Sequence, residues 1–218
     1  MKLRPLVLCA SIALFAAAAA GALDYSLGLR GGASGSFLSG AYATALDTSL
    51  AERGSLTRTP QPLLSYRADA FFRVGITGWF AVQAEAGFGP IGGGVLASNG
   101  LNLLVGVSGN EIRLPVMAVF SLTAPFGTFS LMAGPFAGYS IVPQLIENNG
   151  LVYTTSPLQP MFYAGLAGGL EYRLPLGPGS LVVDARYTHR ILPTIMDTNA
   201  LTPLAIELTA GYMITIKK

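Results

Sequence analysis

The clearest hydrophobic pattern of the chain lies in its last long stretch, residues 204–216, where every second residue is apolar. The apolar positions are Leu204, Ile206, Leu208, Ala210, Tyr212, Ile214 and Ile216. Because side chains alternate between the two faces of a strand, this pattern predicts a strand with one apolar face and one mostly polar face. Its length exceeds the about five or six residues of a globular strand and fits the roughly 9–11 that cross a bilayer at a tilt. It therefore predicts the closing strand of a transmembrane β-barrel.

The same period of two recurs in seven further stretches, which we expect to be the other strands of one barrel. They lie near residues 23–37, 64–76, 80–88, 109–121, 129–141, 162–173 and 181–188. Long connections are expected near 39–62, 89–108, 143–160 and 191–203, and they alternate with short turns, as in outer-membrane barrels. The predicted fold class is all-β, an eight-stranded antiparallel up-and-down transmembrane β-barrel whose interior is filled by side chains. Pro115 and Pro135 should meet in one hairpin and open its pairing, since proline cannot donate to the ladder.

Nearly all charged residues of these strands fall on the face that alternation places inside. Twelve are expected to form a charge network in the lumen: Arg30, Arg67, Asp69, Arg73, Glu85, Glu111, Arg113, Glu171, Arg173, Asp184, Arg186 and Glu207. With Asp24 the inner face would hold seven acids and six arginines, so the charges nearly cancel, as a network of mutual ion pairs requires. A selective pore would more often show a ring of one sign. We therefore expect a closed lumen.

Two of these arginines, Arg113 and Arg186, are the first choices for members of the network. Each lies in mid-strand with an acid two residues away on the same face. Small inner residues such as Gly165, Gly169 and Gly211 should make room for the long side chains.

Aromatic residues on the predicted lipid face lie near strand ends, where membrane-interface girdles are found. Those expected towards the periplasm are Tyr25, Phe72, Phe80, Phe120, Phe129, Tyr172 and Tyr212. Those expected towards the outer rim are Phe37, Tyr66, Phe88, Tyr139, Phe162 and Tyr187.

Composition agrees with a membrane barrel. The 218 residues are 51% hydrophobic and only 11% charged, against about 25% charged in soluble domains. No apolar run long enough for a transmembrane helix follows the N-terminus. Excess apolarity without such a run is what many alternating strands produce.

The first 22 residues have the pattern of a secretory signal peptide, with a positive start, an apolar stretch and a small-residue cleavage site. We expect cleavage before Leu23, leaving 23–218 as the barrel. Cys9, the only cysteine, lies within the signal, so the mature chain would have no disulfide. Removal of Lys2 and Arg4 lowers the basic count from 13 to 11, equal to the 11 acids, and no basic patch indicates nucleic acid.

The chain offers little material for catalysis or for a cofactor. His189 invites comparison with small barrels that deacylate lipid A, but that chemistry needs a serine and an acid in line with the imidazole. Alternation places His189 on the outer face near the rim, so a histidine facing lipid headgroups is the preferred interpretation. No cluster has metal-ligand spacing, and the glycine runs lack the context of a phosphate loop, so we expect no enzyme activity, metal or cofactor.

Three segments together resemble the PorT-like outer-membrane β-barrel family, whose members are small eight-stranded barrels of the OmpA/OmpX type. They are Glu111-Ile112-Arg113-Leu114-Pro115, Tyr163-x-Gly165-x-x-x-Gly169-Leu170-Glu171-Tyr172 and Asp184-Ala185-Arg186-Tyr187. The resemblance covers most of the mature chain and implies the eight-stranded architecture. It implies little about function beyond accessory roles in secretion.

The sequence thus favours an integral barrel in the outer membrane of a diderm bacterium, with a structural, adhesion or interaction role. Expected partners are outer-membrane lipid, an unknown extracellular or envelope partner at the surface loops, and the barrel-assembly machinery. The last follows from the spacing of Thr209, Gly211, Ile214 and Ile216, which resembles the C-terminal signal read by that machinery. The alternatives are a lipid-modifying enzyme, a narrow channel or secretion accessory, and a soluble lipocalin-like barrel with the opposite polarity.

Overall fold

The computed structural model describes residues 23–37, 57–98, 102–148, 153–157, 161–192 and 204–216. Side chains are described over 23–37, 62–94, 108–141, 162–191 and 204–216. The expected signal peptide at 1–22 lies outside these residues. Among the described residues there is no helix long and apolar enough to cross a membrane.

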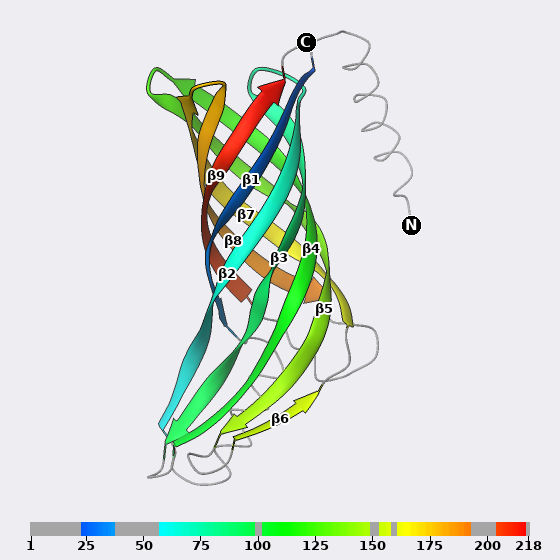
Figure 1. Ribbon diagram of the computed structural model, residues 1–218, viewed down its shortest axis with the longest axis vertical. Coiled ribbons are helices and arrows are strands. Elements are labelled where there is room, and N and C mark those ends of the chain that lie inside the picture. The colour runs from blue at the N-terminus through cyan, green and yellow to red at the C-terminus, as the bar shows by residue number, and fades with distance from the viewer. Residues whose placement is uncertain are drawn as a thin grey trace.

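The described residues form nine strands in one antiparallel sheet. Their bounds are β1 Asp24–Phe37, β2 Thr57–Gly75, β3 Phe80–Ser98, β4 Asn102–Ala124, β5 Gly127–Asn148, β6 Tyr153–Pro157, β7 Met161–Leu176, β8 Gly179–Leu192 and β9 Leu204–Ile216. Eight of them close a barrel in the order β1-β2-β3-β4-β5-β7-β8-β9, with β9 paired to β1 (Figure 1). The short β6 pairs with β5 alone within the described part of the chain. The predicted all-β, eight-stranded closed barrel is confirmed.

The barrel has two different ends. At one end, the turn end, short connections join β2 to β3, β4 to β5 and β7 to β8. The β4–β5 loop is Pro125–Phe126 and the β7–β8 loop is Gly177–Pro178. Gly177 has a φ of +60°, a left-handed conformation that glycine adopts without strain. At the opposite end, the loop end, β1 finishes at Phe37 and β9 begins at Leu204.

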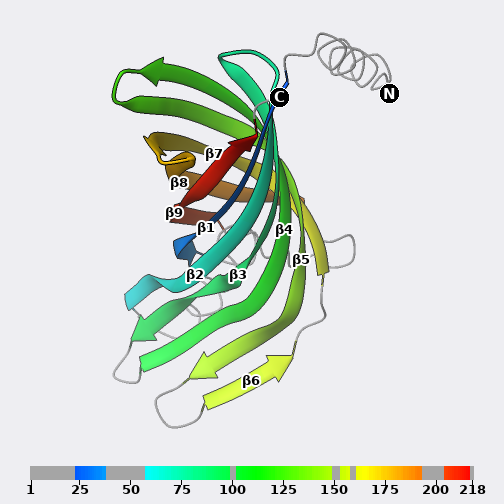
Figure 2. The same ribbon diagram turned by 45° about the horizontal axis from the view of Figure 1, so that its top comes forward.

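Three of the expected long connections are wrong in extent. Strand β2 begins at Thr57, and β3 and β4 are separated only by residues 99–101. Strand β5 continues to Asn148 and then pairs with β6. These extensions form an open sheet of β2–β6 that projects past the barrel on one side, as Figure 2 shows. The alternation pattern did not predict this sheet, because glycines such as Gly92, Gly93 and Gly94 have no side chain that could mark a face.

The predicted alternation between the two faces of each strand is confirmed. In β9, Leu208 is 60% exposed on the outside, while its neighbours Glu207 and Thr209 are 3% and 2% exposed. The outer wall is apolar, and the inner wall carries most of the polar side chains. Apolar side chains also enter the lumen in two groups: Ala81, Met117, Val119, Met132, Phe136, Tyr163 and Ala167, and separately Phe71, Val182 and Met213. Ion pairs and these apolar groups share the interior.

The ladder is interrupted in several places, two of them next to prolines. Between the pairs Pro115–Phe136 and Ala118–Ala133, β4 and β5 have no paired residues, and the register is the same on both sides. This is the open pairing expected from the two prolines. Between β2 and β3 the register shifts between Pro62 and Ala68. There the Ser65 hydroxyl donates to the carbonyl oxygen of Pro90 at 3.1 Å.

The aromatic residues gather near the two ends of the outer wall, where they were expected. The pairs at the turn end are Tyr25–Phe72, Phe80–Phe120 and Phe129–Tyr172, with ring centroids 6.1, 5.2 and 4.9 Å apart. At the loop end, Tyr139 and Phe162 lie 4.6 Å apart. Such girdles mark the levels of the two membrane–water interfaces.

Candidate functional site

The twelve charged residues expected inside the barrel all lie on its inner wall. Eleven are buried, with exposed fractions of 1–5%, and Arg173 keeps 20% of its side chain exposed near the turn end. Strand β2 contributes Arg67, Asp69 and Arg73, while the others come singly or in pairs from β1, β3, β4, β7, β8 and β9. They face one another because each strand places its inward positions two residues apart.

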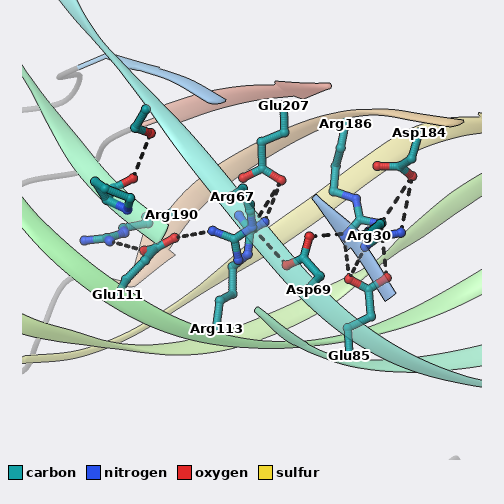
Figure 3. Close-up of polar contacts among 12 residues, drawn as sticks. Arg30, Arg67, Asp69, Glu85, Glu111, Arg113, Asp184, Arg186, Arg190 and Glu207 are labelled. Atoms are coloured by element: carbon teal, nitrogen blue, oxygen red, sulfur yellow. Dashed lines mark hydrogen bonds and ion pairs between the residues drawn. The ribbon is translucent and has the colours of Figure 1, made fainter. Parts of the chain in front are cut away.

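The first group of contacts is centred on Glu85. Its carboxylate accepts hydrogen bonds from Arg30 Nη2 at 2.6 Å and from Arg186 Nη1 and Nη2 at 2.6 and 3.1 Å. Gln83 Nε2 donates to the same carboxylate at 2.6 Å. Asp184 lies on the far side of the two arginines, 3.3 Å from Arg186 and 3.7 Å from Arg30. Figure 3 shows Glu85, Arg30, Arg186 and Asp184 at one end of a row of charged side chains.

The second group is centred on Glu111. Arg67 Nη1 donates to its carboxylate at 3.1 Å, Arg190 Nη2 donates at 2.7 Å, and the Tyr163 hydroxyl donates as well. The Arg190 guanidinium also lies over the Tyr163 ring, 3.4 Å from the ring centroid, and forms a cation–π contact.

The two groups are joined through Asp69. Arg67 Nε lies 3.1 Å from one of its oxygens and Arg30 Nε lies 3.4 Å from the other. At the other side of the first group, Gln83 Oε1 accepts from Arg73 Nε at 2.6 Å. The result is one continuous network along the lumen.

At the turn end the network finishes on Glu171. Arg73 makes a two-bonded contact with this carboxylate, at 2.8 and 2.5 Å, and Arg173 Nε lies 3.3 Å away. Every one of the six buried carboxylates on the described inner wall therefore has at least two arginines within 4.0 Å. Shared pairing of this kind is what offsets the loss of hydration of buried charges.

Three of the ion pairs join strands that face one another across the barrel. Arg73 of β2 pairs with Glu171 of β7, and Glu85 of β3 pairs with Arg186 of β8. Arg113 of β4 pairs with Glu207 of β9 at 2.6 Å. In each case three strands separate the partners in both directions around the wall. Side chains that meet across the full width of so narrow a barrel occupy its cross-section.

Glycines leave the space that these side chains occupy. A Cβ at Gly87 would overlap Asp69 Oδ1 and the guanidinium of Arg67. A Cβ at Gly211 would overlap the main chain of Leu29 and come within 2.5 Å of Arg30 Cβ. Gly211 and Gly169 thus lie against Arg30 and Arg186, as expected. The expectation for Gly165 is wrong, because it lies against the Phe136 ring, and Gly87 was not foreseen.

Sequence reasoning missed Arg190 as a member of the network and did not say which acid Arg113 would meet. Arg190 lies four residues after Arg186 on β8, so alternation places both side chains on the inner face. Arg190 is 5% exposed there. Arg113 is a member of the network as expected, and its hydrogen-bond partner is Glu207 across the lumen. Asp24, counted as an inner acid, is exposed at the start of β1. The described inner wall therefore holds seven arginines and six acids.

His189 lies on the outer wall, as alternation predicted. Its ring stacks on Tyr187 with centroids 6.4 Å apart, and its Nδ1 has no hydrogen-bond partner among the described residues. A catalytic serine and an orienting acid are therefore not in contact with this nitrogen. Within the described ranges no group of three or more His, Cys, Asp or Glu residues could hold a metal ion.

No family description matches this chain, and no curated protein is similar to it in sequence. Among solved structures, Ail, the attachment invasion locus protein of Yersinia pestis, is similar with a TM-score of 0.46 and 12% identity over 87% of this chain and 99% of that one. The outer membrane protein OprG of Pseudomonas aeruginosa has a TM-score of 0.44 and 11% identity, with 88% and 96% covered. The outer membrane protease OmpT of Escherichia coli has a TM-score of 0.36 and 10% identity, with 89% and 96% covered.

Proposed function

We propose that this chain is an integral outer-membrane protein of a diderm bacterium with a sealed barrel and a structural, adhesion or interaction role. The barrel anchors the protein in lipid. The segments at the loop end, including the projecting sheet of β2–β6, meet the outside and an extracellular or envelope partner. In this orientation the turn end faces the periplasm, since outer-membrane barrels have short turns there.

The observation that carries this proposal is the division between the two faces of the wall. The outer face is apolar and bounded by aromatic girdles at both ends. The inner face is occupied by ion pairs that connect opposite strands. A wall of this kind is stable in lipid, and its filled interior offers solutes no wide path.

Localisation is tested by membrane fractionation together with gel mobility before and after heating. We expect the protein in the outer-membrane fraction and a change of mobility on heating, because a folded barrel migrates differently from the unfolded chain. A soluble periplasmic protein with one mobility would contradict the proposal and favour the lipocalin-like alternative. Crosslinking on intact cells followed by purification of the outer membrane then identifies the partner at the loop end.

The proposed role is not enzymatic. The mass of lipid A, measured with and without expression of the protein, should be unchanged. A change in acylation that depends on His189 would overturn this part of the proposal and favour a lipid-modifying enzyme. Expression of the His189→Ala variant in the same strain is the control.

Membership of the PorT-like family also belongs to this proposal. It is supported by the three segments named above, of which Glu111, Arg113, Glu171, Asp184 and Arg186 are members of the ion-pair network. In this interpretation the residues that carry the resemblance are those that fill the barrel. Export through a cleaved signal peptide at 1–22 is tested by sequencing the mature N-terminus, which should begin at Leu23.

A further inference from the structure

A contact that occurs twice ties the turns of the turn end to neighbouring strands. The Tyr172 hydroxyl, on β7, donates to the carbonyl oxygen of Phe126 in the β4–β5 turn at 2.5 Å. The Tyr212 hydroxyl, on β9, donates to the carbonyl oxygen of Leu176 at the β7–β8 turn at 2.7 Å. In both cases the tyrosine belongs to the barrel strand that follows the hairpin, and it reaches back to that hairpin's turn.

Each tyrosine ring lies against the glycine that ends the turn. A Cβ at Gly127 would come within 2.6 Å of Tyr172 Cε2, and a Cβ at Gly179 within 2.9 Å of Tyr212 Cε1. Carbon atoms in contact are about 3.5–4.0 Å apart, so any larger residue would displace the ring. It would also collide with the main chain, because a Cβ at Gly127 would lie 2.7 Å from the Arg173 carbonyl oxygen and a Cβ at Gly179 would overlap that of Met213. The glycine and the tyrosine therefore form a matched pair at each of the two turns.

The third turn, between β2 and β3, is built differently. A Cβ at Gly78 would meet no atom within 4 Å, so no ring is seated there. The carbonyl oxygen of Trp79 instead accepts the backbone N–H of Ser121, on β4, at 2.7 Å. This turn is thus tied to the following strand by the main chain, and within the turn the Thr77 hydroxyl oxygen accepts the backbone N–H of Phe80 at 3.0 Å.

We propose that Tyr172 with Gly127 and Tyr212 with Gly179 act as latches that hold two turns closed at the membrane interface. This role goes beyond the anchoring of aromatic rings among lipid headgroups. Anchoring needs only an amphipathic ring at the right depth. A latch also needs the hydrogen bond from the tyrosine hydroxyl to the turn and a glycine against which the ring can pack, which we call the glycine seat. Without the latch, the turn carbonyls exchange their protein partner for water and the turn opens more often.

The hydroxyl is tested with Tyr172→Phe and Tyr212→Phe, read out by amide hydrogen exchange of the full barrel in lipid nanodiscs. Loss of one hydrogen bond should speed exchange about three- to tenfold, and only in the turn to which the altered tyrosine is bonded. Tyr25→Phe is the matched control. Tyr25 belongs to the same girdle through its contact with Phe72, and its hydroxyl has no protein partner in the described structure.

The glycine seat is tested with Gly179→Ala against Gly78→Ala, neither of which has a left-handed φ. We expect faster exchange in the β7–β8 turn for Gly179→Ala and unchanged exchange in the β2–β3 turn for Gly78→Ala. Because a Cβ at Gly179 would also overlap the Met213 carbonyl oxygen, Gly179→Ala is repeated in the Tyr212→Phe background. There it should add little if the glycine acts through the Tyr212 hydrogen bond, and an equal increase in both backgrounds would contradict this part of the proposal. The latch proposal is overturned if the tyrosine variants exchange no faster than Tyr25→Phe. It is equally overturned if all turns speed up together, since that would show a general loss of stability.

Discussion

Arg113 of β4 and Glu207 of β9 form a buried ion pair with a distance of 2.6 Å, although their strands lie on opposite sides of the barrel. Glu207 has a second, more distant partner in Arg67 at 3.7 Å, and the Arg113 guanidinium lies 5.3 Å from the centroid of the Phe136 ring. The pair therefore links β4 with β9 through the centre of the lumen, and its further contacts reach β2 and β5. Its removal should lower the stability of the whole barrel.

We predict that Arg113→Met lowers the free energy of unfolding by about 3 kcal/mol, because Glu207 is left as a poorly compensated buried charge. Adding Glu207→Gln removes that charge, so the double variant should be more stable than Arg113→Met alone. Equilibrium unfolding of the barrel in detergent micelles measures both. A double variant that is destabilised by the sum of the two single effects would show that the residues do not interact.

The lipid-facing side of β9 provides a second prediction. Leu208 is 60% exposed on the outer wall, and Leu208→Arg near mid-membrane should lower stability by about 2–4 kcal/mol. Leu208→Met, which keeps the position apolar, should lower it by less than about 1.5 kcal/mol. Unfolding equilibria in lipid vesicles make the comparison. Similar losses for the two variants would mean that Leu208 does not face hydrocarbon.

A third prediction concerns the space left by Gly87. A methyl group there would collide with Asp69 and Arg67, so Gly87→Ala should lower stability by about 1–3 kcal/mol. Gly35→Ala is the matched control, since its Cβ would meet only Leu64 Cδ2 at 3.5 Å, an ordinary contact. That control should remain within about 0.5 kcal/mol of the wild type in the same unfolding experiment. Equal effects of the two changes would contradict the packing described around Gly87.

The fold could be predicted from the sequence wherever side chains report which face they occupy. In β9 the strict alternation from Leu204 to Ile216 gave the observed strand bounds. The extensions of β2–β5 could not be predicted in this way. They lie beyond the barrel, where Pro60 and Pro62 or the glycines at 92–94 replace the regular pattern of apolar and polar residues.

The network was predictable in its membership and less so in its pairing. The position of an arginine in the alternating pattern is enough to place it inside the barrel. This holds for Arg30 and would also have placed Arg190 there. Which acid an arginine meets depends on the tilt and closure of the barrel: Glu111 is the acid nearest to Arg113 along its own strand face, but Arg113 donates its hydrogen bond to Glu207. Distances across a lumen have no counterpart in the linear pattern of a strand.

We infer that the ion-pair network closes the lumen. Single-channel recording of the refolded barrel in a planar bilayer tests it most directly, with a water-filled porin in the same bilayer as the positive control. Because ion pairs connect three sets of opposite strands, we predict no steady conductance from the wild-type protein. Steady, reproducible open-channel steps would contradict the sealed lumen and make the barrel a channel.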